Sequence, residues 1–296
     1  MIQNLPTMSN SYSHLRLSWR MKGLTMAVLL MVMALCGCGH VIRKKPATTT
    51  PNYYKTVSDH TVYGLACEGC NDSVVVLLPL DGSDPVRYDC LLASRRNHIL
   101  GKIQIGDNIA LLPNKSDPHR ADIVIDLEDL KGIWCYVVMP KMRDFTTLSK
   151  RDQAKKLAEM PDSIKETYMI PREYGFWMKR DWQCQSVGYV PDQSALEDES
   201  PVVYPPLSYF AEWHIWNCKL ITVSGKPVVG KDGKQLISNV RLDTCDIDYL
   251  TNDSLVLSSD GISRSYYRKH NINEVNAKAK RIAAQLSQQA MKKITE

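Results

Sequence analysis

The stretch "KGIWCYVVMP" (Lys131–Pro140) is a turn-forming residue pair followed by an apolar strand, and it lies at the start of the larger part of this chain. From there to "ISRSYYRKH" (262–270), short runs rich in β-branched and aromatic residues alternate with Gly, Asp and Pro. Asp232-Gly233 and Asp260-Gly261 mark two of the turns. Residues 123–270 therefore predict an antiparallel β-barrel or sandwich.

A second β-rich region lies upstream, at residues 52–113. Its first half, "TVYGLACEGCNDSVVVLLPLDGSDPVRYDCLLA" (61–93), consists of β-rich runs separated by Glu-Gly, Asn-Asp, Asp-Gly and Asp-Pro turns. This spacing predicts a small barrel or sandwich of its own. The polar, proline-containing segment 114–122 is expected to link the two β domains.

Two helical passages accompany the strands. Ser149 and Asp152 predict the capped start of a helix that ends near Pro161, within an inserted segment at 150–168. Residues 271–296 are expected to form a C-terminal helix, because Asn271 and Glu274 suit a capping box. Its apolar stripe should dock on the barrel rather than on a membrane, and consists of Val275, Ala279, Ile282, Leu286 and Ala290. The predicted fold class is mainly β, with two small antiparallel domains and a C-terminal α-helix.

The triplet Gly132-Ile133-Trp134 resembles the Gly-x-Trp motif of lipocalins, in which the Trp closes the barrel floor on the first strand. In that family an arginine of the last strand packs across the Trp, and Arg268 in "SYYRKH" lies where this residue is expected. The resemblance implies a lipocalin-like barrel whose floor contains Gly132, Trp134 and Arg268. The middle-strand motif of the family is not evident, so another antiparallel barrel or sandwich remains open.

A barrel of about eight strands can enclose one small ligand. Four tryptophans are candidates for lining or covering such a cavity: Trp177, Trp182, Trp213 and Trp216. Tyr209 and Phe210 are further candidates. The alternative also stays open, in which these aromatic residues fill the core and leave no cavity.

Residues 1–37 are expected to be a signal peptide. Basic residues precede an apolar run from Leu24 to Leu35, and this run is shorter than the ~20 residues that a membrane-spanning helix needs. "LCGC" (Leu35-Cys36-Gly37-Cys38) resembles the lipobox of bacterial lipoproteins, which implies that Cys38 becomes the lipidated N-terminal residue. Residues 38–51 then form a tether.

The residues after Cys38 bear on localisation. The lipoprotein resemblance implies the outer membrane, because Gly39 replaces the Asp that would favour the inner membrane. No acidic tract follows, which favours the side that faces the periplasm. Removing residues 1–37 lowers the net charge of +5 by three, so a nucleic-acid partner has no electrostatic support.

Cys67-Glu68-Gly69-Cys70 is a lone Cys-x-x-Cys motif. Such a motif indicates a redox pair, half of a metal site or a local disulfide. The surrounding twenty residues resemble the opening of copper-resistance and envelope-stress lipoproteins, although Ala66 replaces the usual proline. The alternative function is therefore a metal- or redox-responsive lipoprotein that uses Cys67 and Cys70.

Motifs of the common enzyme classes are absent: the sequence has no G-x-S-x-G, H-E-x-x-H, P-loop or dinucleotide fingerprint. The leading hypothesis is a membrane-anchored binding or interaction protein without enzymatic activity. It needs no cofactor beyond the lipid on Cys38. Its expected partners are the bacterial membrane and either a small apolar ligand or an envelope protein.

Overall fold

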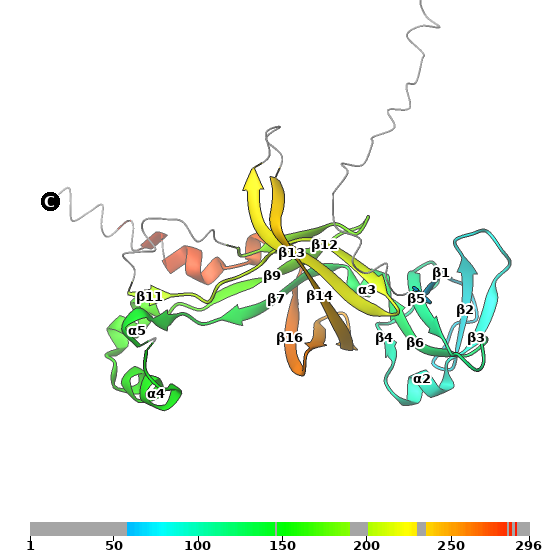
Figure 1. Ribbon diagram of the computed structural model, residues 1–296, viewed down its shortest axis with the longest axis horizontal. Helices are drawn as coiled ribbons and strands as arrows, with labels where there is room; N and C mark the ends of the chain where they lie inside the picture. Colours follow the sequence, from blue (N-terminus) through cyan, green and yellow to red (C-terminus); the bar gives the residue numbers. More distant parts are fainter. Residues whose placement is uncertain are drawn as a thin grey trace, which may run out of the picture. The chain divides into compact units, whose positions relative to one another are not determined.

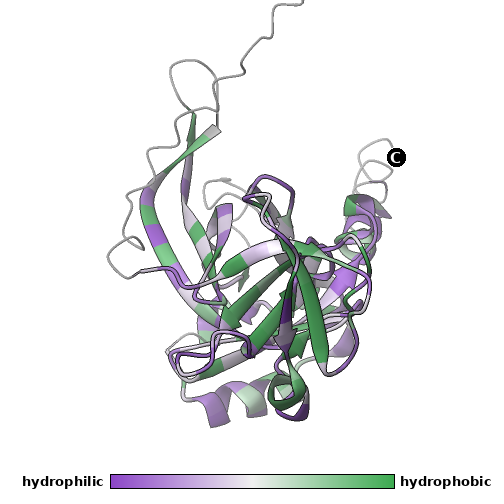
Figure 2. Cartoon of the chain, turned by 90° about the vertical axis from the view of Figure 1, so that its right-hand side faces the viewer, coloured by the Kyte–Doolittle hydropathy of each residue, from purple (hydrophilic) through white to green (hydrophobic). Residues whose placement is uncertain are grey.

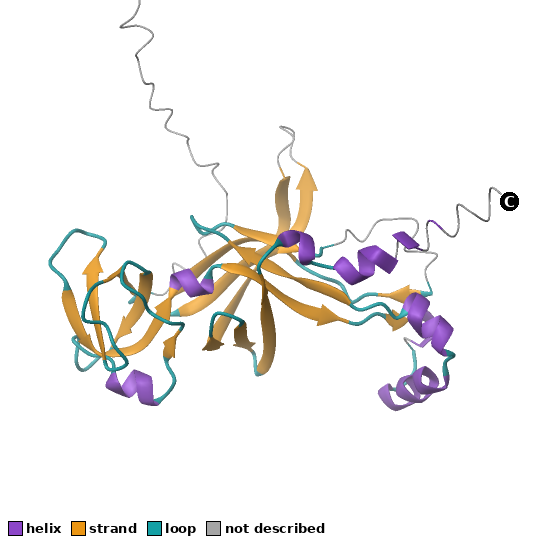
Figure 3. Cartoon of the chain, turned by 180° about the vertical axis from the view of Figure 1, so that it is seen from behind, coloured by secondary structure: helices purple, strands orange, loops and turns teal. Residues whose placement is uncertain are grey.

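The computed structural model describes residues 58–145, 147–189, 201–229, 235–282, 284, 285 and 288. These residues form a mainly β structure with a few short helices (Figure 1; Figure 3). The fold class predicted from the sequence is thereby confirmed. The signal peptide, the tether and Cys38 lie outside the described residues.

The first sheet has six strands in the order β3-β2-β1-β5-β6-β4. All neighbours are antiparallel except β4 and β6, which run parallel. The helix α2 (Leu91–Arg95) follows β3. The strands are β1 (Val62–Ala66), β2 (Val74–Pro79), β3 (Val86–Asp89), β4 (Ile99–Leu100), β5 (Asn108–Pro113) and β6 (Ala121–Asp126).

The second sheet has eight antiparallel strands in the order β10-β9-β7-β16-β15-β14-β13-β12. Each strand pairs with its neighbours along the chain, and the last strand, β16, returns to pair with the first, β7. The strands are β7 (Gly132–Val138), β9 (Arg172–Met178), β10 (Cys184–Val187), β12 (Tyr209–Trp216), β13 (Lys219–Val229), β14 (Gln235–Leu250), β15 (Ser254–Ser259) and β16 (Ile262–Lys269).

The two ends of this sheet, β10 and β12, meet each other. Residues Gln183 and Glu212 form an isolated antiparallel bridge. The backbone N–H of Trp213 donates to the carbonyl of Trp182 at 2.9 Å, and the N–H of Phe210 donates to the Ser186 hydroxyl at 2.6 Å. The sheet therefore closes into an up-and-down barrel.

A separate excursion joins β7 to β9. It contains β8 (Lys141–Met142), a short 3₁₀ turn, α4 (Lys150–Glu159) and α5 (Asp162–Tyr168). The Ser149 hydroxyl accepts the Asp152 N–H at 3.2 Å, as the capping pattern predicted. The strand β8 pairs with β11 (Val202–Val203), so this excursion adds no strand to the barrel.

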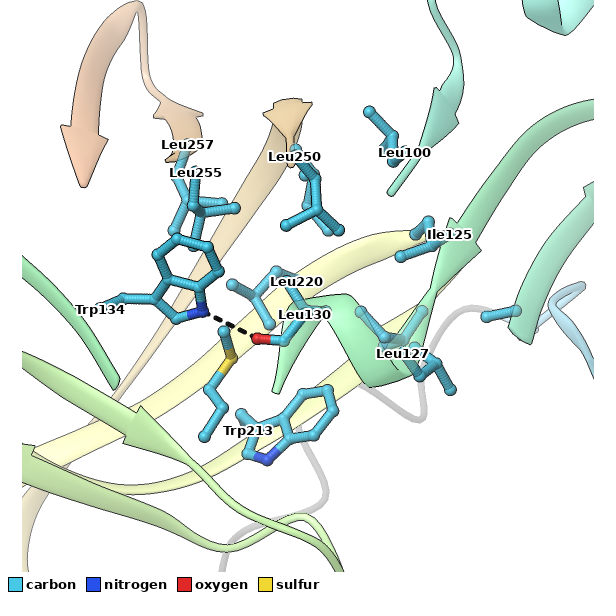
Figure 4. Close-up of a cluster of buried hydrophobic side chains, with 14 of the residues drawn as sticks. Leu100, Ile125, Leu127, Leu130, Trp134, Trp213, Leu220, Leu250, Leu255 and Leu257 are labelled. Atoms are coloured by element: carbon cyan, nitrogen blue, oxygen red, sulfur yellow. Dashed lines mark hydrogen bonds between the residues drawn. The ribbon is translucent and has the colours of Figure 1, made fainter. Parts of the chain in front are cut away.

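The barrel and the first sheet share one hydrophobic core. Leu100 and Ile125 of the first sheet join Leu127 and Leu130 of α3 (Leu127–Leu130) in the same cluster as Trp134 and the barrel leucines (Figure 4). The first sheet buries a second cluster on its own, around Val75, Leu77 and Ile109. Residues 52–296 accordingly form one compact unit.

Alternating burial explains why these sequences form strands. Both β2 and β15 bury every second residue, and hydrophobic and hydrophilic residues succeed one another along several strands in Figure 2. Their β-branched and aliphatic residues suit this half-buried surface.

Residues 114–122 do not form the expected linker between two domains. This segment joins β5 to β6 of one sheet, and β6 includes its last two residues. The chain passes to the barrel through α3 instead. The antiparallel β5–β6 pairing is the physical reason, because the polar residues between the strands serve as a hairpin loop.

The C-terminal helix also begins later than expected. Residues Ile272–Glu274 form a 3₁₀ turn, and Asn276 has a φ of 59°, which a continuous helix does not permit. Helical residues start at 277. Asn276 is held in place because its N–H and side chain bond to Glu173, while Val275 is buried against the outside of the barrel. Leu286 and Ala290 lie outside the described residues.

One buried carboxyl lies at the start of α3. Asp126 is 1% exposed and accepts the N–H groups of Glu128 and Asp129. Burial raises its pKa to about 7, and the neighbouring carboxylates of Asp107 and Asp129 act in the same direction. The folded protein thus retains a proton that the unfolded chain releases near pH 4.

We therefore expect the free energy of unfolding to decrease between about pH 4 and pH 7 through this group. Asp126→Asn keeps a good helix cap and removes the titration, so its stability should depend less on pH than that of the wild type. Urea unfolding at several pH values measures the difference. The exposed Asp84→Asn is the control, and an equal pH dependence in all three proteins would contradict the prediction.

Candidate ligand-binding site

The barrel contains a cavity of about 570 Å³. Its walls come from seven of the eight barrel strands, since inward-facing residues alternate with outward-facing ones along each strand. On β7, the cavity-lining Tyr136 lies two residues after Trp134. On β16, the cavity-lining Tyr266 lies two residues before Arg268. The lining side chains include Tyr136, Tyr174, Phe176, Phe210, Thr222, Cys245, Leu257 and Tyr266.

The apolar part of the wall is a group of packed rings. The ring centre of Phe176 lies 5.2 Å from that of Phe210 and 5.1 Å from that of Tyr266. Tyr136 packs edge-on against both Tyr174 and Tyr266, at 5.6 and 5.4 Å. Most of these contacts are edge-to-face, an arrangement that aromatic pairs favour, and they make this part of the wall largely apolar.

The phenol groups of this wall stay uncharged at neutral pH. Burial raises the pKa of Tyr266 to about 12, and it also raises the pKa of Tyr174 and of Tyr136. The Tyr174 hydroxyl donates to the backbone carbonyl of Ser208. The tyrosines therefore contribute aromatic surface and neutral hydrogen-bonding groups.

Charged side chains line another part of the cavity. The Arg264 guanidinium lies 4.4 Å from the ring centre of Tyr136, and Arg241 forms a 2.7 Å ion pair with Asp243. Asp260 is the fourth charged lining residue. Two cations and two anions leave this part of the wall near neutrality, with many hydrogen-bonding groups.

A buried hydroxyl lies on the same face of the sheet. Ser224 pairs with Phe210 on one side and with Arg241 on the other, and paired residues of antiparallel strands point to the same face. Ser224 is fully buried, and its hydroxyl is one of two buried side-chain groups without a hydrogen-bond partner among the described residues. Burying a hydroxyl without a hydrogen-bond partner costs free energy, so a polar group of a ligand near Ser224 would be stabilised.

The predicted barrel-floor residues meet in the structure. Trp134 and Arg268 are direct partners across β7 and β16, and the guanidinium lies 4.2 Å from the ring centre of the fully buried Trp134. Arg268 also donates to the carbonyls of Lys131, Asp129 and Asn252. The indole N–H donates to the Leu130 carbonyl at 2.8 Å (Figure 4).

Gly132 makes room for this arginine. Its φ of 142° lies in a region that side chains rarely adopt, and a Cβ atom there would collide with the Arg268 guanidinium. A bulkier residue at position 132 would displace Arg268 from the carbonyls that it bonds.

The four candidate tryptophans do not line the barrel cavity. Trp213 is buried in the shared core, with Trp182 against it. Trp177 packs on the outside of the barrel near Val275. Trp216 ends β12 and is half buried. Phe210 was expected from the sequence and does line the cavity, whereas the lining tyrosines were not expected. The two-residue spacing from Trp134 to Tyr136 indicated one of them.

Cys67 and Cys70 are both free thiols in the structure, without a disulfide between them. The Cys70 sulfur instead accepts the Val76 N–H at 3.3 Å, and the Cys67 N–H donates to the Val76 carbonyl at 2.8 Å. Both residues thus serve the β1–β2 connection. Within the described part of the chain, no group of three metal-ligating side chains could hold an ion.

The fold and the cavity together define a class: an eight-stranded up-and-down β-barrel, the architecture found in lipocalins. Among solved structures, the chain is similar to a lipocalin-like protein from Bacteroides thetaiotaomicron, at 20% identity and a TM-score of 0.24. The match covers 47% of this chain and 94% of that one.

No family model matches the sequence, and no curated protein matches it either. None of the helices in the described residues is long and apolar enough to cross a membrane.

The floor contacts predict a large effect of Trp134→Ala. Removing a fully buried Trp should lower the free energy of unfolding by about 3–5 kcal/mol, and it also removes the ring under Arg268. The half-buried Trp216→Ala is the matched control and should cost clearly less. Chemical denaturation of both variants measures the difference, and equal, small losses would show that the floor does not stabilise the barrel.

Proposed function

We propose that this protein binds one small molecule inside its barrel, without catalysing a reaction. The observation that carries the proposal is the cavity of about 570 Å³, which falls within the range of about 300–1,000 Å³ typical of ligand sites. Its mixture of packed aromatic rings and a few polar groups is also typical of such sites.

The distribution of side chains defines the ligand that fits. An apolar or aromatic body would contact Phe176, Phe210 and Tyr266, where each Å² of buried apolar surface contributes about 25 cal/mol. A polar end would lie among Arg241, Asp243 and Arg264. The ligand is therefore a small amphipathic molecule.

The titratable groups of the cavity support binding rather than catalysis. Burial, together with Asp243, Asp246 and Asp260, raises the pKa of the Cys245 thiol to about 11. With the phenol of Tyr266 also protonated at neutral pH, neither group is poised as a nucleophile or a general base. No cofactor is required for binding of this kind.

We further propose that the mature chain begins at lipidated Cys38 and is anchored in the outer membrane, facing the periplasm. The lipobox-like "LCGC" supports the anchor, and Gly39 supports the outer membrane. The tether of residues 38–51 would give the barrel access to ligands in the surrounding space.

Filling the cavity tests the binding proposal. Cys245 lines the cavity, whereas its exposed neighbour Thr244 points to the other face of β14. Cys245→Trp should therefore weaken binding of the fluorescent probe N-phenyl-1-naphthylamine by about tenfold or more, the equivalent of about 1.4 kcal/mol. Thr244→Trp should leave that affinity unchanged.

Circular dichroism and thermal unfolding would establish that both variants fold. Mass spectrometry of organic extracts from purified wild-type protein would then identify a co-purifying ligand, which Cys245→Trp should lack. Equal probe affinity in the folded Cys245→Trp and Thr244→Trp variants would overturn the proposal.

The anchor has its own test. Intact-mass analysis of protein extracted from its native membrane should show a chain that starts at Cys38 and carries a lipid increment. Cys38→Ser should abolish the increment and release the protein from the membrane fraction. An unmodified chain, cut at another residue in the wild type, would contradict the prediction.

A further inference from the structure

A second cavity, of about 590 Å³, lies between the first sheet and the barrel. Its floor is apolar, with Ile109 fully buried and Leu127 7% exposed. Tyr63 and Trp213 contribute aromatic surface, and Trp182 stands against both of them. None of its lining residues lines the barrel cavity, so the two cavities are separate.

Trp182 occupies an unfavourable backbone position. Asp181 and Trp182 lie in the connection between β9, which ends at Met178, and β10, which begins at Cys184, and have φ values of 57° and 61°. Turns with two positive φ values favour Asn-Gly, and a bulky residue in this region is a genuine outlier. Strain of this kind is concentrated at ligand sites.

The strained turn directs the indole into the cavity wall. The Trp182 ring lies 4.9 Å from the Trp213 ring at an interplanar angle of 63°, and 6.2 Å from the Tyr63 ring at 78°. Its carbonyl accepts the Trp213 N–H at 2.9 Å, which fixes the turn against the barrel. Aromatic surfaces of differing orientation thus border one space, an arrangement that suits a flat ring system.

One cation at the edge of this cavity offers a partner for an anionic group of a ligand. The charged lining residues are Lys131, Arg180 and Asp181, and the Glu128 carboxylate beside Lys131 brings the local charge to two cations and two anions. Glu128 stands behind Lys131, and its carboxylate oxygen is already bonded to the Lys131 ammonium at 2.6 Å and to the Asn108 amide at 2.7 Å. Arg180 is exposed at the rim, where an acidic group of a ligand could reach it.

We propose that this cavity is a second binding site, for a planar aromatic molecule that carries an anionic group. The aromatic body would lie against Trp182 and Trp213, and the anionic group would face Arg180. This site is independent of the ligand in the barrel.

Two fluorescent probes with the same ring systems test the proposal. 8-Anilinonaphthalene-1-sulfonate is anionic, whereas N-phenyl-1-naphthylamine lacks the sulfonate. Titrations use the full chain with Cys245→Trp, which occupies part of the barrel cavity, and are repeated with the wild-type barrel. Arg180→Glu should weaken binding of the sulfonate probe by about tenfold or more and leave the neutral probe unchanged. The exposed Arg95→Glu, which makes the same change in net charge, is the control.

Trp182→Gly provides the second test. Glycine accepts the turn conformation, so the variant should fold, as thermal unfolding would establish, while both probes bind at least about tenfold more weakly to this site. Unchanged affinities in folded Trp182→Gly, or equal losses in Arg180→Glu and Arg95→Glu, would overturn the proposal. Comparing Cys245→Trp with Thr244→Trp in the Trp182→Gly background changes the barrel cavity while the second site is already disabled, so failure of one site is distinguishable from failure of the other.

Discussion

Arg268 joins the first and the last strand of the barrel at the point where the chain enters it. Its guanidinium covers the indole of Trp134 and bonds carbonyls from three other positions, so one side chain holds together β7, β16 and the end of α3. Both the closed core below and the open cavity above depend on this arrangement, because it fixes which face of β7 points inward. Trp134 and Tyr136 then take their places on that face.

The same contact explains why the first sheet and the barrel form one unit. Two of the carbonyls that accept from Arg268 come from α3 and the residue after it, Asp129 and Lys131, and α3 also supplies leucines of the core around Trp134. A polar contact and an apolar contact therefore coincide at one junction. Burial of the barrel floor requires the first sheet, which provides Leu100 and Ile125.

The fold was predictable where local patterns decide the outcome. The Gly132-Ile133-Trp134 triplet and Arg268 predicted the barrel floor, and Ser149 predicted the start of α4. Pairing between strands was less predictable. The strand β6 lies in the first sheet because it pairs with β5, and the composition of β6 does not reveal this pairing. The cavity walls depended on register, since Phe176 points inward and its neighbour Trp177 points outward. A tryptophan in a strand carries no information about which face it occupies.

The closure of the barrel between β10 and β12 has a mechanical consequence. Along the other lines of contact between neighbouring strands, regular ladders of backbone hydrogen bonds run between paired residues, and such ladders resist stretching as a unit. Between β10 and β12, the contacts among the described residues include only one isolated backbone bridge, Gln183–Glu212, and a hydrogen bond to the Ser186 hydroxyl. We therefore expect the circumference of the barrel to widen first at this line, beside Phe210, because fewer hydrogen bonds resist separation there than around Tyr136.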